Sequence, residues 1–220
     1  DAGTLTLTAS IKSLSGVNGI HGSDDGSDAN NNTLATEAGV RYSISNPITY
    51  INSNIVGFLH VLENCRYYGV KHLIYASSSS VYGMNIKQPF STSDRTDYPI
   101  SLYAATKKSN EVMAHAYSSL YGINCIGLRF FTVYGPWGRP DMALFKFTKN
   151  ILENKKIELF NNGNHTRDFT YIDDVIDGIF SLIKKPNKNQ IPFNIFNIGN
   201  GNSKKLKVYI KLIEKKLNLK

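Results

Sequence analysis

Helical patterns alternate with short apolar runs along most of the chain, and this alternation limits the possible folds more than any other feature of the sequence. In residues 47–68 apolar side chains recur at helical spacing, Gly69 suits the end of that helix, and the apolar run 70–76 suits a buried strand. Such alternation is typical of an α/β fold with a doubly wound, mainly parallel sheet of the Rossmann type. It also predicts helices over 102–120, 142–152, 173–185 and 208–217 and strands over 123–131, 157–160 and 193–199.

The first 33 residues differ in composition from the rest. They are rich in Gly, Ser, Asp and Asn and hold too few apolar side chains for a core, so we expect loop or disorder there. Gly16, Gly19 and Gly22 have the spacing of a dinucleotide-binding loop. The residues before them make a poor buried strand, however, and those after them cannot form the required helix. We therefore interpret this spacing as chance.

The charge and cysteine content exclude some classes of partner. The net charge is +8, but the lysines gather near the C-terminus among Asn and Ile, which is typical of a solvated surface. No nucleic-acid motif accompanies them, although an anionic small substrate is a second use for positive charge. Two cysteines and five histidines show no metal-ligand spacing, and no apolar run reaches bilayer length. We expect a cytoplasmic protein with reduced cysteines, no metal, no nucleic acid and no membrane contact.

A run of four serines follows the strand predicted over 70–76. In parallel sheets, chemistry gathers at the carboxyl ends of strands, and this is where residues 77–80 fall. A flexible linker would not be followed directly by Val81 and Tyr82. The serine run is thus interpreted as part of a site.

Tyr103 and Lys107 form the next candidate pair. Residues four apart share one face of a helix, and an ammonium beside a phenol stabilises the phenolate. A tyrosine whose pKa is lowered in this way can act as a general acid or base. Many helices carry such a pair by chance, but its position 25 residues after Ser78 favours a shared site.

Longer stretches resemble the extended short-chain dehydrogenases/reductases, specifically nucleotide-sugar 4-epimerases and most closely UDP-glucuronate 4-epimerases. The resemblance covers about residues 34–203. The stretches that carry it are AGVRYSISNP, NSNIVGFLHVLE, YASSSSVYG, YAATKKSNE, LRFFTVYGPWGRPDMALFKFT, RDFTYIDDV and FNIFNIGNG.

This resemblance implies NAD as cofactor, a UDP-sugar as substrate and a homodimer. Tyr103 would be the acid/base at the sugar 4-hydroxyl, and Lys107 would lower its pKa and bind the nicotinamide ribose. Ser78 matches the catalytic serine or threonine, and Ser80 would share its contact. The residues implied beside the cofactor are Tyr103, Lys107, Asn54, Ala76 and Phe131.

Several residues match substrate-binding positions of this family, but some of them also suit a purely structural role. Thr132 would lie with Phe131 between nicotinamide and sugar, and Phe160 near the base, although either phenylalanine suits a core equally well. Arg139 and Arg167 would lie near the sugar diphosphate, where the planar guanidinium pairs two oxygens. Arg167 stands beside an aspartate and would also suit a surface ion pair.

The serine run also separates two reactions within this superfamily. Nucleotide-sugar dehydratases resemble the same pattern but carry Asp-Glu where this chain has Ser79 and Ser80. Dehydration needs such an acid/base pair, so the sequence favours epimerisation at C4 through a transient 4-keto sugar.

The resemblance also divides the chain and leaves alternatives. We assign 34–138 to the catalytic part of a Rossmann-like domain and 139–220 to a partial substrate-binding region with segments that return to the sheet; 1–33 stay unassigned. The family's N-terminal phosphate-binding half is not recognisable. The alternatives are a fragment that only binds nucleotide-sugar or a partner subunit, and a related UDP-sugar oxidoreductase or decarboxylase.

Overall fold

The computed structural model describes residues 4–6, 43–140, 142–157, 159, 163 and 166–218. Their chain forms two compact units. One contains the described residues up to Phe130 together with Phe180–Asn197, and the other contains Phe131–Ile179 and the residues from Ile198 onward. The sequence-based division into a catalytic part (34–138) and a substrate-binding region (139–220) stays a prediction, because it assigns roles in substrate binding and these compact units do not.

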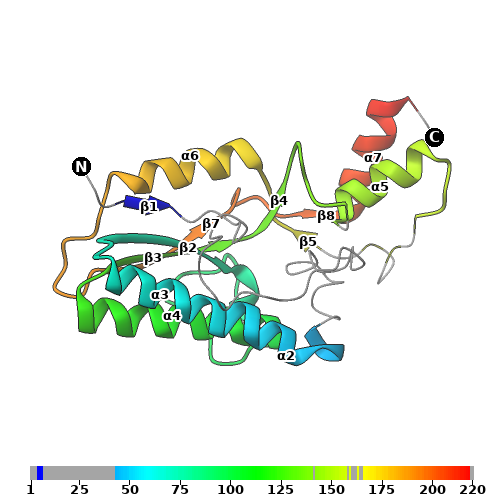
Figure 1. Ribbon diagram of the computed structural model, residues 1–220. Coiled ribbons are helices and arrows are strands. Elements are labelled where there is room, and N and C mark those ends of the chain that lie inside the picture. Colours follow the sequence, from blue (N-terminus) through cyan, green and yellow to red (C-terminus); the bar gives the residue numbers. More distant parts are fainter. Residues whose placement is uncertain are drawn as a thin grey trace. The chain divides into compact units, whose positions relative to one another are not determined.

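The first unit is built on a sheet with strand order β1-β2-β3-β7. β2 pairs in parallel with both β1 and β3, so the α/β fold with a mainly parallel sheet is confirmed. Helices α3 (Gly57–Tyr67) and α4 (Leu102–Tyr121) lie side by side against the β2–β3 pair (Figure 1). The strands are β1 (Thr4–Thr6), β2 (His72–Ser78), β3 (Asn124–Phe130) and β7 (Phe193–Ile198).

The helix predicted over residues 47–68 is one continuous rod with a wider turn inside it. It runs through α2 (Pro47–Tyr50), a π-helical segment η2 (Ile51–Val56) and α3 (Gly57–Tyr67). Gly69 ends it with a φ of 66°, the left-handed conformation that glycine adopts without strain. The Val70 N–H then bonds to the Cys65 carbonyl at 2.8 Å, which completes the cap. Because the cap includes Val70, β2 begins at His72 rather than at residue 70, and it extends to include Ser77 and Ser78.

The core of this unit lies between the two helices and the sheet. It combines small and medium apolar side chains with the large ring of Tyr75, and partly buried side chains such as Phe58 and Met113 pack against it. Burial raises the pKa of the Cys65 thiol to about 11 and that of Cys125 to about 12, and both thiols are free. The buried cluster comprises Leu62, Cys65, Leu73, Tyr75, Ala114, Ile123 and Cys125.

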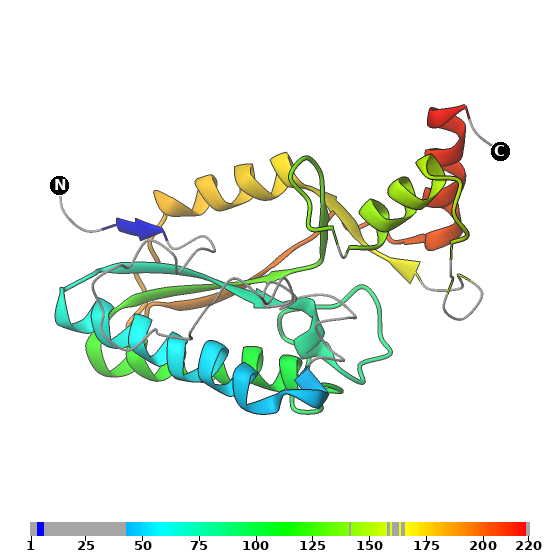
Figure 2. The same ribbon diagram turned by 45° about the vertical axis from the view of Figure 1, so that its right-hand side comes forward.

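The second unit contains short strand pairs and two of the predicted helices. β4 (Thr132–Tyr134) pairs in parallel with β6 (Phe169–Tyr171), and β5 (Thr166–Arg167) pairs antiparallel with β8 (Lys204–Lys205). Helices α5 (Ala143–Leu152) and α7 (Leu206–Leu217) are drawn towards the C-terminal end of the chain in Figure 2. α6 (Ile172–Ile183) begins with two acidic residues in its first turn, as a helix dipole favours.

Three sequence-based expectations need correction or stay open. Thr4–Thr6 forms β1 beside β2, so the expectation of loop throughout residues 1–33 is wrong at this point. The β-branched threonines favour a strand. The composition of residues 1–33 as a whole is dominated by the glycines and asparagines further along, so it does not reveal this local preference. The glycine triplet lies outside the described residues. Of the strand expected over 157–160, only Ile157 and Leu159 are described, and neither is in a strand.

Candidate active site

The serine run is an ordered turn at the carboxyl end of β2. Ser78 caps the short 3-10 helix η3 (Ser79–Tyr82): its Oγ accepts the Ser80 N–H at 3.1 Å. The same Oγ donates to Ser80 Oγ at 3.0 Å. Ser78 is buried and Ser80 is half-buried. Because the Ser78 proton already bonds to Ser80 Oγ, the Ser80 hydroxyl is the one placed to donate to a ligand.

Tyr103 and Lys107 lie in the first two turns of α4 (Leu102–Tyr121), which Ser101 caps by accepting the Ala104 N–H at 3.1 Å. Tyr103 is buried, and its ring meets the ring of Tyr50 edge to face. α4 contacts both β2 and η3. The helix therefore holds the tyrosine and lysine against the strand that ends in the serines.

Lys107 joins α4 directly to the carboxyl end of β2. Its Nζ donates to the carbonyl oxygen of Ala76 at 3.1 Å. Burial lowers the pKa of Lys107 to about 8. The side chain thus still carries its charge at neutral pH, as a partner that stabilises a phenolate must.

Asn54 lies in the π-helical segment η2 and links that segment to α4 through a hydrogen bond. Its amide nitrogen donates to Thr106 Oγ1 at 3.0 Å, and Thr106 Oγ1 donates to the Tyr103 carbonyl at 2.8 Å. With its amide nitrogen turned toward them, Asn110 donates to the carbonyl oxygens of Asn54 and Thr106. These bonds fix the turn that carries Tyr103. A direct contact of Asn54 with cofactor stays a prediction.

The remaining predicted site residues belong to the second unit or lie outside the described residues. Thr132 pairs with Phe169, and the Phe131 N–H bonds to the Ile198 carbonyl at 3.2 Å. Arg139 is half-buried, whereas Arg167 is exposed and donates to the Thr166 carbonyl at 3.1 Å. Phe160 is not among the described residues. The roles expected for all of these stay predictions.

Asp168 organises a loop in the second unit that no sequence pattern pointed to. Its carboxylate accepts the backbone N–H groups of Asn200 at 2.9 Å and Gly201 at 2.7 Å, and the Thr170 hydroxyl at 3.0 Å. Gly199 precedes this turn, and a side chain there would meet the Phe131 ring at 3.0 Å. Asp168 therefore shapes the loop beside Phe131 rather than forming an ion pair with its neighbour Arg167.

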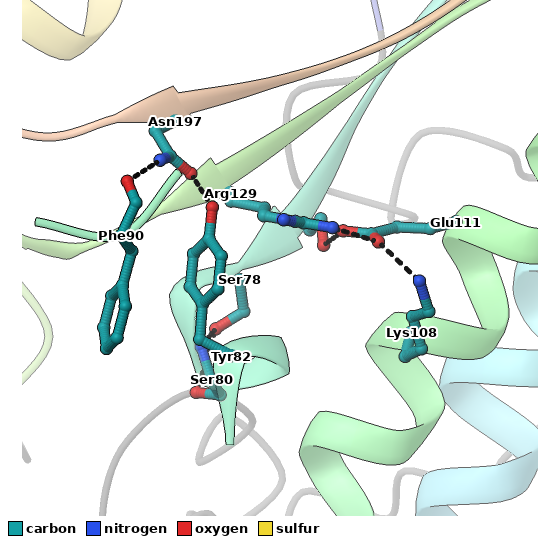
Figure 3. A network of polar contacts seen from close by, with 9 residues as sticks. Ser78, Ser80, Tyr82, Phe90, Lys108, Glu111, Arg129 and Asn197 are labelled. Atoms are coloured by element: carbon teal, nitrogen blue, oxygen red, sulfur yellow. Dashed lines mark hydrogen bonds and ion pairs between the residues drawn. The ribbon is translucent and has the colours of Figure 1, made fainter. Parts of the chain in front are cut away.

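A buried polar network behind the serines was also not predicted. Glu111 and Arg129 form an ion pair with two hydrogen bonds (Figure 3). Ser77 donates to the same carboxylate. Two signals were present in the sequence. Glu111 follows Lys107 at helical spacing, and Arg129 stands inside an otherwise apolar strand. A charge in such a strand needs a buried partner.

The residues at this strand end fit the nicotinamide-ribose part of a dinucleotide. The Lys107 ammonium has three N–H donors and gives one to Ala76, so donors remain for ribose hydroxyls. Ala76 itself is exposed, which leaves the strand end accessible.

The described part of the chain shows neither a metal centre nor a membrane span. It holds no group of three or more His, Cys, Asp or Glu side chains placed to bind a metal ion. Within the same part, every helix is too short or too polar to cross a bilayer.

Sequence comparisons identify relatives across most of the chain. The model of the NAD dependent epimerase/dehydratase family matches residues 20–199. Protein CapI of Staphylococcus aureus is 57% identical over 198 residues, which cover 84% of this chain and 59% of the relative. UDP-glucuronate 4-epimerase 1 of Arabidopsis thaliana is 48% identical over 200 residues, covering 85% of this chain and 47% of the relative.

Solved structures agree with these relatives. UDP-glucuronic acid 4-epimerase from Bacillus cereus, in complex with UDP-glucuronic acid and NAD, matches with a TM-score of 0.76 and 36% identity, covering 83% of this chain and 57% of that one. MoeE5 in complex with UDP-glucuronic acid and NAD matches with a TM-score of 0.77 and 30% identity, covering 83% and 60%. The chain spans about half the length of the curated relatives it matches. With the family model matching residues 20–199, the chain belongs to the NAD dependent epimerase/dehydratase family.

Proposed function

We propose that the protein is an NAD-dependent UDP-sugar 4-epimerase that interconverts UDP-glucuronate and UDP-galacturonate. The observation that carries this proposal is the bond from Lys107 to Ala76, which ties the tyrosine-bearing helix to the strand that ends in Ser78. We place the Tyr103 phenol, the Lys107 ammonium and the two serine hydroxyls together at this strand end. Relatives named UDP-glucuronate 4-epimerase support the choice of sugar.

The chain's own groups can carry the proton chemistry. The Tyr103 phenolate, stabilised by the Lys107 ammonium, takes the proton of the sugar 4-hydroxyl and later returns it. Ser78 already donates to Ser80, so Ser80 is the hydroxyl that donates to the sugar oxygen. NAD, when bound, would supply the redox chemistry: it would accept the C4 hydride and return it to the opposite face of the transient 4-keto sugar. Ser79 carries no carboxylate, so nothing at this turn removes a hydroxyl from C6.

The resemblance to the family carries the proposed substrate contacts. Arg139 and Arg167 bind the diphosphate or the sugar carboxylate, since a guanidinium pairs two oxygens of such groups. Phe131 and Thr132 lie against the sugar, and Phe160 against the base. We place the reaction in the cytoplasm, where NAD and nucleotide-sugars are available.

A second copy of the chain is the proposed partner. Helices α3 and α4 expose apolar side chains, including Leu59 at 38% and Val112 at 57%. Covering them in a homodimer would remove apolar surface from water. Val112→Asp should shift the sedimentation of the protein from dimer to monomer, and an unchanged dimer would contradict this assignment.

The activity is tested by incubating purified protein with NAD and UDP-glucuronate. UDP-galacturonate should form without net NADH, and Tyr103→Phe should lower the rate by at least about 100-fold. Tyr117→Phe is a matched control on the same helix. Net NADH production would identify an oxidoreductase or decarboxylase instead. If no product forms, calorimetry with NAD and UDP-glucuronate separately tests the binding-only alternative.

A further inference from the structure

One buried carboxylate connects the helix that carries Tyr103 to the strand that carries the serines. Glu111 Oε1 accepts from Ser77 Oγ at 2.6 Å and from Arg129 Nε at 2.8 Å, while Oε2 accepts from Arg129 Nη2 at 2.9 Å. The two charged side chains are only 3% and 4% exposed. Lys108 approaches Oε2 at 3.7 Å from the partly exposed side.

The same ion pair extends to the far end of the serine turn. The Arg129 guanidinium lies 4.8 Å from the centre of the Tyr82 ring. That ring stacks on Phe90 at 4.5 Å, and its hydroxyl donates to Asn197 Oδ1 at 2.6 Å. Ser78 and Ser80 lie between Ser77 and Tyr82 in the chain, and Figure 3 shows them close to the Tyr82 side chain. The segment from Ser77 to Tyr82 is thus held at both ends by one pair of charges.

Stability alone does not explain this arrangement. Burying an ion pair carries a large desolvation penalty, and apolar side chains of similar volume often stabilise a core equally well or better. What the pair adds is fixed geometry, because a carboxylate and a guanidinium meet in one planar orientation. Glu111 stands four residues after Lys107 and eight after Tyr103, on the same side of α4.

We propose that Glu111, Arg129 and Ser77 are positioning residues that hold the Ser78–Ser80 turn in register with Tyr103 and Lys107. None of the three touches the substrate. They set the distance between the acid/base tyrosine and the hydroxyls that bind the same sugar oxygen. This inference rests on the proposed 4-epimerase function, since that function requires both groups at one oxygen.

Ser77→Ala is the sharpest test, because it removes one hydroxyl and leaves the ion pair intact. We expect kcat for UDP-glucuronate to fall on the order of 10- to 100-fold with KM nearly unchanged, as small displacements of reacting groups cause. The Ser80 amide, which bonds to Ser78 Oγ, should exchange its hydrogen at least about tenfold faster. Tyr117→Phe removes a similar hydroxyl-to-carboxylate bond, to Glu63, further along α4. That control should change neither quantity.

The double variant Glu111→Leu/Arg129→Met separates positioning from stability. If it folds and keeps its unfolding midpoint, we expect the same fall in kcat and the same faster exchange at Ser80. If the folded double variant, or Ser77→Ala, has the same kcat as the wild-type protein, the inference is overturned. If the double variant does not fold, Ser77→Ala decides alone.

Amide exchange also keeps this inference distinct from the proposed function. It is measured on the 220-residue chain without substrate. If the wild-type protein shows no epimerisation, the proposed function fails. If the Ser80 amide of the Ser77→Ala variant then exchanges at the same rate as in the wild-type protein, the positioning role is still overturned. If exchange in the variant is faster only at residues 78–82, the positioning role is supported.

Discussion

Replacing Lys107 with methionine should stabilise the folded chain at neutral pH while removing an ammonium that the proposed reaction needs. Burial lowers the pKa of Lys107 from its ordinary value of 10.5 to about 8 in the folded chain. The unfolded chain therefore holds more protons than the folded chain between these two pH values, and stability rises with pH across that window. The penalty for this half-buried charge is full below about pH 8 and absent above the unfolded-state pKa of 10.5.

The size of the effect follows from that difference in pKa. From 10.5 to about 8, at about 1.4 kcal/mol per pKa unit, the penalty at pH 7 is about 3 kcal/mol. Methionine also loses the bond to the Ala76 carbonyl, which offsets about 1 kcal/mol. We expect a net gain of about 2 kcal/mol at pH 7, or roughly 4–8 °C in Tm. At pH 10 the gain should be near zero, because most of the penalty has gone.

Urea denaturation followed by circular dichroism at pH 7 and pH 10 measures both values. Lys71→Met is the control, because that lysine is exposed just before β2. The control should show no gain that depends on pH. A Lys107→Met protein that is less stable than wild type at pH 7, or that differs from it equally at both pH values, would refute the reasoning. The variant should also lose epimerase activity.

Three further substitutions test packing and loop geometry. Gly127→Ala should destabilise the chain by about 1–3 kcal/mol in urea denaturation, because a Cβ there would lie 2.6 Å from Tyr75 Oη; an unchanged midpoint would show that the core adapts. Gly178→Ala meets only ordinary contacts inside α6 and should stabilise by about 0.5–1 kcal/mol in the same assay. Asp168→Asn places an amide where the carboxylate accepts the Gly201 N–H, and should cost about 1.5–3 kcal/mol. Wild-type stability there would argue against the structural role of this loop anchor.

Most helices and strands were predictable because their signals are local. Apolar spacing located the helix around η2 and α3 and the long helix α4 almost to the residue. β2 was placed two residues too early, since the helix cap at Gly69 and Val70 is a backbone feature that hydrophobicity does not reveal. The two-residue strands β5 and β8 were missed, because so few residues carry no recognisable period.

The candidate site was predictable in part. The serines at a strand end and the Tyr103–Lys107 spacing are patterns within one element, so the order of residues along the chain is enough to recognise them. The network behind them joins residues that are distant in the chain. Ser77 and Glu111 are 34 positions apart, and Tyr82 and Asn197 are 115 apart. No local pattern relates such pairs.

The sequence by itself determined the α/β alternation, the position of the serines at the end of a strand and the shared helix face of Tyr103 and Lys107. Each of these depends on the spacing of neighbours along the backbone. Only the tertiary structure decided that Lys107 bonds to Ala76 with a lowered pKa, and that Glu111 and Arg129 neutralise each other behind the serine turn. Burial and charge pairing arise when separate elements pack together, so they depend on contacts between residues that are far apart in the chain.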